Sequence, residues 1–194
     1  MSIRFARLSD IPAMLDIYSH YVRNTTYSFE YIVPSVQEFT RRFEALTEQF
    51  AWLVWEENGQ VLGYVYGSAP FERAAYQWCA ELSIYLHPQS CGKGIGRQLY
   101  EVSEEILRLQ GYRLVYAIIT SENEASMAFH KHLGYKTTAV FPGCGIKFDR
   151  ILGTVWMEKQ LNPVEIPTCA PISAKAVVNT DRKKQKVLDK LSLS

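Results

Sequence analysis

The segment Gln89-Ser90-Cys91-Gly92-Lys93-Gly94-Ile95-Gly96 stands between two strongly patterned stretches of the chain. The stretch before it, from Tyr76 to Leu86, is dense in apolar and aromatic residues and predicts a buried central strand. After it, apolar residues recur at helical spacing up to Gly111, which predicts a long helix. Glycines at such a junction let the backbone approach a ligand, and the amides at the helix start attract anions. The segment therefore predicts a pyrophosphate-binding loop.

The spacing of the glycines argues against two common nucleotide-binding loops. A P-loop requires Ser or Thr after Gly-Lys, whereas Gly94 follows Lys93 here. A dinucleotide fingerprint has the pattern Gly-x-Gly-x-x-Gly early in a parallel unit, whereas this loop has Gly-x-Gly-x-Gly in the middle of the chain. A purely structural turn would need one glycine rather than three. A different pyrophosphate site remains, with Lys93 or Arg97 adding charge at its edge.

The hydrophobic pattern predicts the other elements of the fold. Apolar residues with helical period predict helices at 11–22, 35–49, 95–110 and 124–133. Strands are predicted at 3–8, 51–56, 60–67, 76–86, 114–120, 135–141 and 154–158, with Asn58-Gly59 as a hairpin turn. The resulting order is strand, two helices, three strands, helix, strand, helix, two strands. This order predicts an α/β fold with a mixed sheet flanked by helices.

The composition favours one domain and a small-molecule partner. With 194 residues, 47% of them hydrophobic, the chain can bury one sizeable core. We expect one domain over residues 1–162 and a tail, 163–194, that is proline-containing, partly basic and flexible or weakly helical. The formal net charge of +1 gives no broad basic field for a nucleic acid or an anionic membrane. We therefore expect neither as a partner.

Metal binding and membrane insertion are also not expected. The four cysteines are far apart without a Cys-x-x-Cys pair, and His20, His87 and His132 lack the spacing of metal ligands. No apolar run approaches the roughly 20 residues of a membrane span, and the first residues lack the apolar core of a secretion signal. The sequence therefore predicts a cytoplasmic protein with free thiols and no metal.

The glycine segment resembles the Gln/Arg-x-x-Gly-x-Gly/Ala motif of the GNAT superfamily of acetyl-CoA-dependent N-acetyltransferases. The element order, Asn123 and the run from Ser126 to Tyr135 extend the resemblance over residues 2–161. Within that superfamily the chain is similar to the phosphinothricin and methionine sulfoximine acetyltransferase group. Three stretches carry this likeness: 75–86, 130–135 and 145–148. The resemblance implies a mostly antiparallel sheet of about six or seven strands, splayed in the middle and flanked by about four helices.

The resemblance also implies how acetyl-CoA would be held. The backbone of Ile84, Tyr85 and Leu86 would pair with the pantetheine arm, because amides of the arm can add to a splayed sheet. Asn123 would contact the same arm. The pyrophosphate would lie on the helix start, held by Gly92, Lys93, Gly94, Ile95, Gly96 and Arg97.

Two residues are candidates for proton transfer. Glu81 lies inside an otherwise apolar strand, where burial would raise its pKa toward neutrality, and the resembling group has a glutamate at this position. We interpret Glu81 as the general base; the alternative is a buried salt bridge to Arg73 or Arg150. His130 stands where the group has a histidine and most GNAT enzymes have a tyrosine that protonates the departing thiolate. The alternative for His130 is a packed or surface histidine.

The acceptor is predicted only as a class. Arg73 would bind a carboxylate, with Lys147 as a further cation, and Phe29, Phe71 and Tyr76 would form the walls of the pocket. The resemblance implies an amino acid or a toxic analogue, such as phosphinothricin or methionine sulfoximine, as the acceptor of the acetyl group. This chain departs from the group in a shorter loop before Tyr76 and in the stretch 148–153, which leaves the acceptor open.

Two other functions remain as alternatives to a small-molecule N-acetyltransferase. A protein or peptide acetyltransferase would require an open acidic groove, and a non-catalytic acyl-CoA-binding module would not depend on Glu81 or His130. The resemblance further implies a homodimer.

Overall fold

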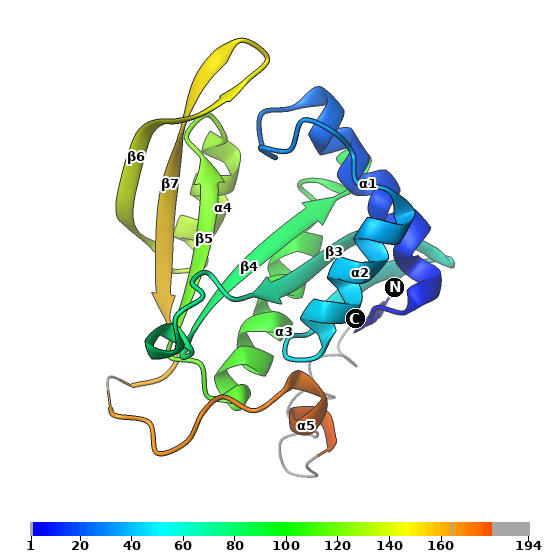
Figure 1. Ribbon diagram of the computed structural model, residues 1–194. Helices are drawn as coiled ribbons and strands as arrows, with labels where there is room; N and C mark the ends of the chain where they lie inside the picture. The colour runs from blue at the N-terminus through cyan, green and yellow to red at the C-terminus, as the bar shows by residue number, and fades with distance from the viewer. Residues whose placement is uncertain (1, 164, 180–194) are drawn as a thin grey trace.

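The computed structural model describes residues 2–163 and 165–179, which form one seven-stranded sheet with helices on both faces (Figure 1). The strand order is β1-β2-β3-β4-β5-β7-β6. The strands are β1 Ser2–Phe5, β2 Trp52–Glu57, β3 Gln60–Ser68, β4 Cys79–Leu86, β5 Leu114–Thr120, β6 Lys136–Lys147 and β7 Arg150–Gln160. The helices are α1 Ile11–Asn24, α2 Val36–Thr47, α3 Ile95–Gln110, α4 Glu124–His132 and α5 Ala174–Asn179. The predicted fold class and element order are confirmed.

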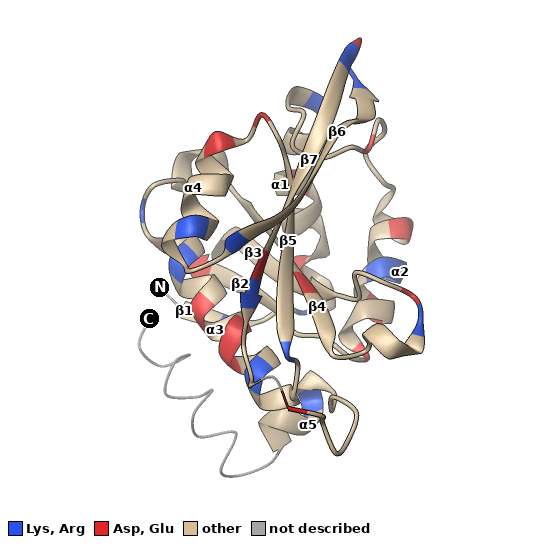
Figure 2. Cartoon of the chain, turned by 90° about the vertical axis from the view of Figure 1, so that its left-hand side faces the viewer, with Lys and Arg blue, Asp and Glu red and all other residues tan. Residues whose placement is uncertain are grey.

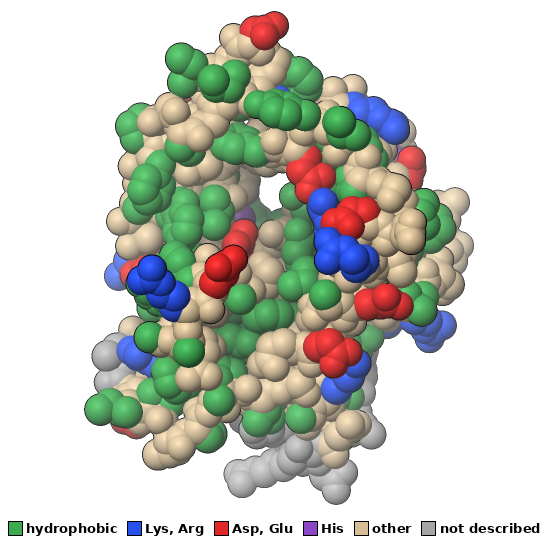
Figure 3. Space-filling model, in the orientation of Figure 1, with side chains coloured by type: hydrophobic (Ala, Val, Ile, Leu, Met, Phe, Trp, Pro, Cys, Tyr) green, Lys and Arg blue, Asp and Glu red, His purple; other side chains and the backbone are tan. Residues whose placement is uncertain are grey.

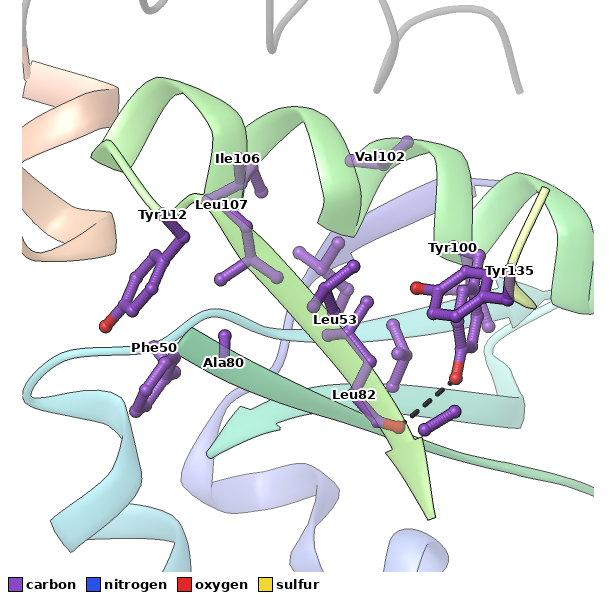
Figure 4. Close-up of a cluster of buried hydrophobic side chains, with 14 of the residues drawn as sticks. Phe50, Leu53, Ala80, Leu82, Tyr100, Val102, Ile106, Leu107, Tyr112 and Tyr135 are labelled. Carbon is purple, nitrogen blue, oxygen red and sulfur yellow. Dashed lines mark hydrogen bonds between the residues drawn. The ribbon is translucent and has the colours of Figure 1, made fainter. Parts of the chain in front are cut away.

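Every pair of neighbouring strands is antiparallel except β4 and β5, which are parallel. Helices α1 and α2 cover one face of the sheet, and α3 and α4 cover the other (Figure 1). Because side chains alternate along a strand, each face has its own apolar cluster. On the α3 face, Tyr100 and Ile106 of the helix pack over Leu53 and Leu82 of the sheet (Figure 4).

The hairpin formed by β6 and β7 is longer than the sequence pattern predicts. Pro142 and Gly143 interrupt the pattern, and β6 accommodates them by a register shift between Phe141 and Gly145. Phe148 and Asp149 form its two-residue turn with φ values of 51° and 56°. A turn of this kind usually contains glycine, and the absence of glycine removed the usual hairpin signal.

The C-terminal tail was expected to be flexible or weakly helical, and its described part contains one short helix that packs on the domain. Residues 174–179 form helix α5, in which Ala174 and Val177 are buried in the cluster under α3. The backbone amide of Ala174 donates to the carbonyl of Gln49 at 2.9 Å. Residues 180–194 of the predicted tail lie outside the described residues.

The charged residues are distributed without a dominant sign. Figure 2 looks onto the side of the molecule formed by β6 and β7 and shows basic and acidic residues interspersed over the helices and strands. Among residues 2–163 and 165–179, no helix is long and apolar enough to cross a membrane.

Candidate active site

Strands β4 and β5 pair only at their beginnings and then separate. The parallel register joins Cys79, Ala80 and Glu81 to Leu114, Val115 and Tyr116 and goes no further. Beyond this point, residues of both strands line a cavity of about 90 Å³. Figure 3 shows an opening through the molecule between the β5–β7 side and the α1 side, with histidine and acidic side chains at its edge. The predicted splayed sheet is therefore present.

The cavity collects three residues that were predicted to bind acetyl-CoA and the predicted general acid, His130. Ile84 and Tyr85 line it from β4, and Asn123 and His130 line it from the far side. The Asn123 side-chain oxygen accepts a hydrogen bond from the Ser126 amide at 3.0 Å and so caps α4. This bond orients the Asn123 side chain and leaves its amide nitrogen to donate to a ligand.

Leu86, the third predicted contact in β4, already has a partner. The hydroxyl of Tyr21, in α1, donates to the Leu86 carbonyl at 2.5 Å. The Tyr21 ring also lines the cavity. Sequence analysis assigned Tyr21 to the apolar face of a helix, and nothing in the helical spacing distinguishes a core tyrosine from one that reaches a strand end.

The glycine loop is an exposed turn that leads into α3. Gly92 and Gly94 have φ values of +77° and +80°, and a Cβ built on either would meet no atom within 4 Å. Their backbone conformation, rather than crowding, therefore requires glycine. Gly96 differs, since a Cβ there would lie 3.5 Å from the Ile84 side chain. Helix α3 begins at Ile95, so the first-turn amides have no acceptor within the helix and face a site suited to an anion.

The two predicted cations at this loop are placed differently. The guanidinium of Arg97 forms an ion pair with Glu101 at 2.8 Å, one turn further along α3. Lys93 lies beside a larger hollow of about 670 Å³, which Gln89 also lines. Lys93 is therefore the better placed of the two to add charge beside the loop.

Glu81 occupies the last position of β4 that pairs with β5, where these two strands separate. Burial raises the pKa of its carboxyl to about 7. No hydrogen bond or ion pair joins it to another described residue, and Arg150 pairs instead with Glu122. The salt bridge considered for Glu81 is therefore absent from the described residues. An unpaired carboxyl with a pKa near neutrality has the properties of a general base.

His130 is 2% exposed and has a hydrogen-bond partner at each ring nitrogen. Nδ1 lies 2.8 Å from the carbonyl of Ser126, and Nε2 lies 2.7 Å from the hydroxyl of Tyr100. The same hydroxyl lies 3.2 Å from the carbonyl of Leu82, the contact drawn in Figure 4. The chain of three contacts therefore has a carbonyl acceptor at each end.

A count of protons decides what His130 can do in this chain. A neutral imidazole and a hydroxyl supply two protons for the three contacts, whereas an imidazolium would supply three. Burial, however, lowers the pKa of His130 to about 4, so the ring is neutral at pH 7. A neutral ring bonded in this way has no proton to spare. The lowered pKa thus favours the packed histidine, and the general-acid role of His130 stays a prediction.

The five residues predicted to contact the acceptor fall into two groups. Phe71, Arg73 and Tyr76 line one cavity of about 380 Å³ beside the connection between β3 and β4. Phe29 lies elsewhere, over Gly145 of β6, where a Cβ on the glycine would be 2.4 Å from its ring. The structure therefore brings three of the five together.

The position of Lys147 corrects the role in substrate binding that was predicted for it. It is 1% exposed, and its ammonium donates to the carbonyls of Val22 at 2.8 Å and Ser28 at 2.6 Å. Desolvation lowers the pKa of this ammonium. Lys147 thus ties the β6–β7 hairpin to the end of α1 instead of facing a ligand.

The site combines a split sheet, a glycine turn at one end of it and an unpaired carboxyl at the split. Comparison with known proteins assigns the class of protein. The family model for the Acetyltransferase (GNAT) domain matches residues 3–156, and the chain belongs to the GNAT acetyltransferase family. Its similarity to relatives named as acetyltransferases identifies it as an N-acetyltransferase.

Two curated relatives and one solved structure illustrate the likeness. The phosphinothricin N-acetyltransferase of Alcaligenes faecalis is 35% identical over 165 residues, which cover 83% of each chain. The L-methionine sulfoximine/L-methionine sulfone acetyltransferase of Salmonella typhimurium is 34% identical over 168 residues, covering 86% of this chain and 98% of the relative. The phosphinothricin acetyltransferase (Pat) of Sinorhizobium meliloti, solved with acetyl-CoA, has a TM-score of 0.83 at 33% identity, covering 86% of this chain and 92% of that one.

Proposed function

We propose that this protein transfers an acetyl group from acetyl-CoA to the primary amine of a small molecule, an amino acid or a toxic analogue such as phosphinothricin or methionine sulfoximine. The observation that carries the proposal is the unpaired Glu81 carboxyl, with a pKa of about 7, at the point where β4 leaves β5. Relatives named for acetylation of phosphinothricin and methionine sulfoximine support the choice of acceptor class.

The residues around the split suit acetyl-CoA, which supplies the acetyl group when bound. The free amides at the start of α3 would hold its pyrophosphate, and the unpaired edge of β4 at Ile84 and Tyr85 would pair with its pantetheine amides. Asn123 would donate to the same arm. These assignments are supported by the edge of β4 toward β5, which has no described strand partner beyond Glu81, and by the first-turn amides of α3, which have no acceptor within the helix.

Glu81 would perform the proton transfer that the reaction needs. An attacking amine must be neutral, and it loses a proton as its nitrogen forms the new bond to the acetyl carbon. The ionised Glu81 carboxylate accepts that proton, directly or through one water, while the bond between the acetyl carbon and sulfur breaks. A pKa near 7 keeps about half of the carboxyl ionised at neutral pH and still makes it a competent proton acceptor.

The acceptor would enter beside the connection between β3 and β4. Arg73 would bind the carboxylate of an amino acid, and Phe71 and Tyr76 would flank the side chain. Because Lys147 is bound by two carbonyls, it has no place in this arrangement.

The proposal is tested by release of free thiol from acetyl-CoA with a panel of amines. Wild-type protein should release thiol with an L-amino acid, phosphinothricin or methionine sulfoximine, and mass spectrometry should detect the N-acetyl product. Silence with all amino acids together with activity on peptides would overturn the proposed acceptor class. Absence of acetyl-CoA binding in calorimetry would overturn the reaction itself. A cytoplasmic location and a homodimer remain predictions, to be tested by cell fractionation and sedimentation.

A further inference from the structure

Two glutamines clamp the middle of the C-terminal segment, residues 165–179. The Gln49 side-chain nitrogen donates to the carbonyls of Pro171 at 3.3 Å and Ile172 at 3.2 Å. The Gln110 side-chain nitrogen donates to the Ile172 carbonyl at 2.8 Å, and the Ile172 amide donates back to the Gln110 carbonyl at 3.0 Å. Gln110 is 3% exposed, so water competes poorly for these bonds. The segment is thus fixed to the ends of α2 and α3.

Helix α5 continues the attachment by burying apolar side chains. Val177 is fully buried and Ala174 is 2% exposed, and both belong to the core cluster that α3 covers. Figure 1 shows the segment passing below the sheet from the end of β7 to this helix beside α3. The C-terminal segment is therefore a packed part of the domain.

One hydrogen bond joins this segment to the connection between β3 and β4, residues 69–78. The indole nitrogen of Trp78 donates to the carbonyl of Cys169 at 3.2 Å. Two residues further along, Pro171 lines the 380 Å³ cavity that Arg73 also lines. The C-terminal segment thus holds one end of the connection and forms part of the wall of this cavity.

The connection adjoins Glu81 from both of its ends. It starts after Ser68, the register partner of Glu81 in β3. It ends where β4 begins at Cys79, two residues before Glu81. In between, the Phe71 ring lies 6.0 Å from the ring of Tyr116, which is the register partner of Glu81 in β5. A change in the position of the connection therefore changes the surroundings of the Glu81 carboxyl.

We propose that residues 165–179 position the acceptor side of the active site by holding the 69–78 connection, with Trp78 as the positioning residue. The inference rests on the proposed function, because it takes the Arg73 cavity as the acceptor site. The GNAT match ends at residue 156 and includes none of this segment. The segment sets the affinity for the acceptor and leaves the acetyl-CoA side, at the other end of β4, unaffected.

The first test removes the hydrogen bond and keeps an aromatic ring, by the substitution Trp78→Phe in the full chain. Phenylalanine keeps a ring at this position but has no N–H to donate to Cys169. The KM for the acceptor should rise about fivefold, the effect of one hydrogen bond, while the KM for acetyl-CoA stays unchanged. The amides of residues 69–78 should also exchange hydrogen faster. An equal rise in both KM values would mean a general structural role and would overturn the proposal.

The second test detaches α5 by the substitution Val177→Asp, with Lys175→Asp as the matched control on the exposed side of the same helix. The aspartate at 177 cannot remain buried, so residues 165–179 should lose protection from hydrogen exchange. The acceptor KM should then rise at least as much as in Trp78→Phe. The Lys175→Asp variant should behave as wild type. Loss of protection in 165–179 without any change in 69–78 or in the acceptor KM would sink the proposal.

The exchange measurement separates this proposal from the proposed function. If wild-type protein acetylates no amine, the proposed function fails, but the coupling of residues 165–179 to 69–78 can still be measured in both variants. If amines are acetylated and the coupling is missing, only the positioning role fails.

Discussion

The two ends of β4 are surrounded by structures that are built in different ways. At its C-terminal end, the glycine turn and the start of α3 form a site from consecutive backbone groups between residues 87 and 97. At its N-terminal end, the 69–78 connection depends on contacts with residues 35 to 91 positions away in the chain, just before β5, in β7 and in the C-terminal segment: Trp78 with Arg113, Phe71 with Trp156 and Trp78 with Cys169. The proposed donor side is thus local in sequence, and the proposed acceptor side is assembled over long range.

This difference explains how one family can keep its acetyl donor and change its acceptor. A local backbone site survives substitution of most side chains, because only the glycine conformations and the helix start matter. A site assembled from distant side chains changes whenever one of its supports changes. Glu81 lies between the two ends, and in the proposed mechanism it would accept a proton whichever acceptor is bound.

The largest expected effect comes from Glu81, which lies between the two ends of β4. The substitution Glu81→Gln should lower kcat by about a thousandfold, since a general base contributes about 10² to 10⁴ to the rate. In the wild type, kcat/KM for the acceptor should fall as the pH drops below 7, because the base must be ionised, and this fall should disappear in the variant. Stopped assays from pH 5.5 to 8.5 would show both effects. Glu57→Gln, on β2 away from the site, is the control; equal activity in the two variants would exclude Glu81 as the base.

His130 tests whether the donor side contains a structural or a catalytic histidine. Its folded pKa of about 4 lies below the ordinary 6.5, so the folded protein binds fewer protons than the unfolded chain between these values. The contribution of neutral His130 to the free energy of unfolding is fully present above pH 6.5 and is lost as the pH falls toward 4. The loss amounts to about 3 kcal/mol. Denaturant unfolding of His130→Phe should show this pH dependence removed.

The control for His130 is His132→Phe, an exposed histidine on the same helix. It should retain the wild-type slope of unfolding free energy against pH. If His130→Phe instead kept its pH-dependent stability and lost an ionisation near 6.5 from the pH–rate profile, the general-acid role would be restored.

Lys147 tests whether a side chain predicted to bind the acceptor is instead structural. Lys147→Met should lower the free energy of unfolding by about 2 kcal/mol, because the carbonyls of Val22 and Ser28 lose a charged donor. Lys136→Met, at an exposed position of β6, should be neutral. Chemical denaturation measures the loss. A normal stability combined with a large rise in acceptor KM would instead return Lys147 to the substrate site.

The same contrast decides how much could be predicted from the sequence. The element order, the glycine turn and the buried position of Glu81 with its raised pKa were predictable, because periodicity and local motifs report on neighbours in the chain. The role of Glu81 as the base stays a prediction. The roles of Lys147 and of the tail were not, since nothing local shows that an ammonium meets the end of α1 or that Trp78 meets Cys169. The Tyr100–His130 contact was missed for the same reason. Its only signal was a tyrosine on the buried face of α3.

The smallest expected effect separates the backbone strain of a glycine turn from its binding role. Gly94 and Gly59 share a left-handed backbone, with φ values of +80° and +76°, and a Cβ on either would meet no atom within 4 Å. Alanine at each should therefore lower the free energy of unfolding by about 1 kcal/mol through the same strain. Only Gly94→Ala should also raise the KM for acetyl-CoA, by about fivefold, with the acceptor KM unchanged. Equal acetyl-CoA kinetics in the two variants would show that the turn before α3 serves folding alone, and the donor side would then have to be sought in the β4 edge.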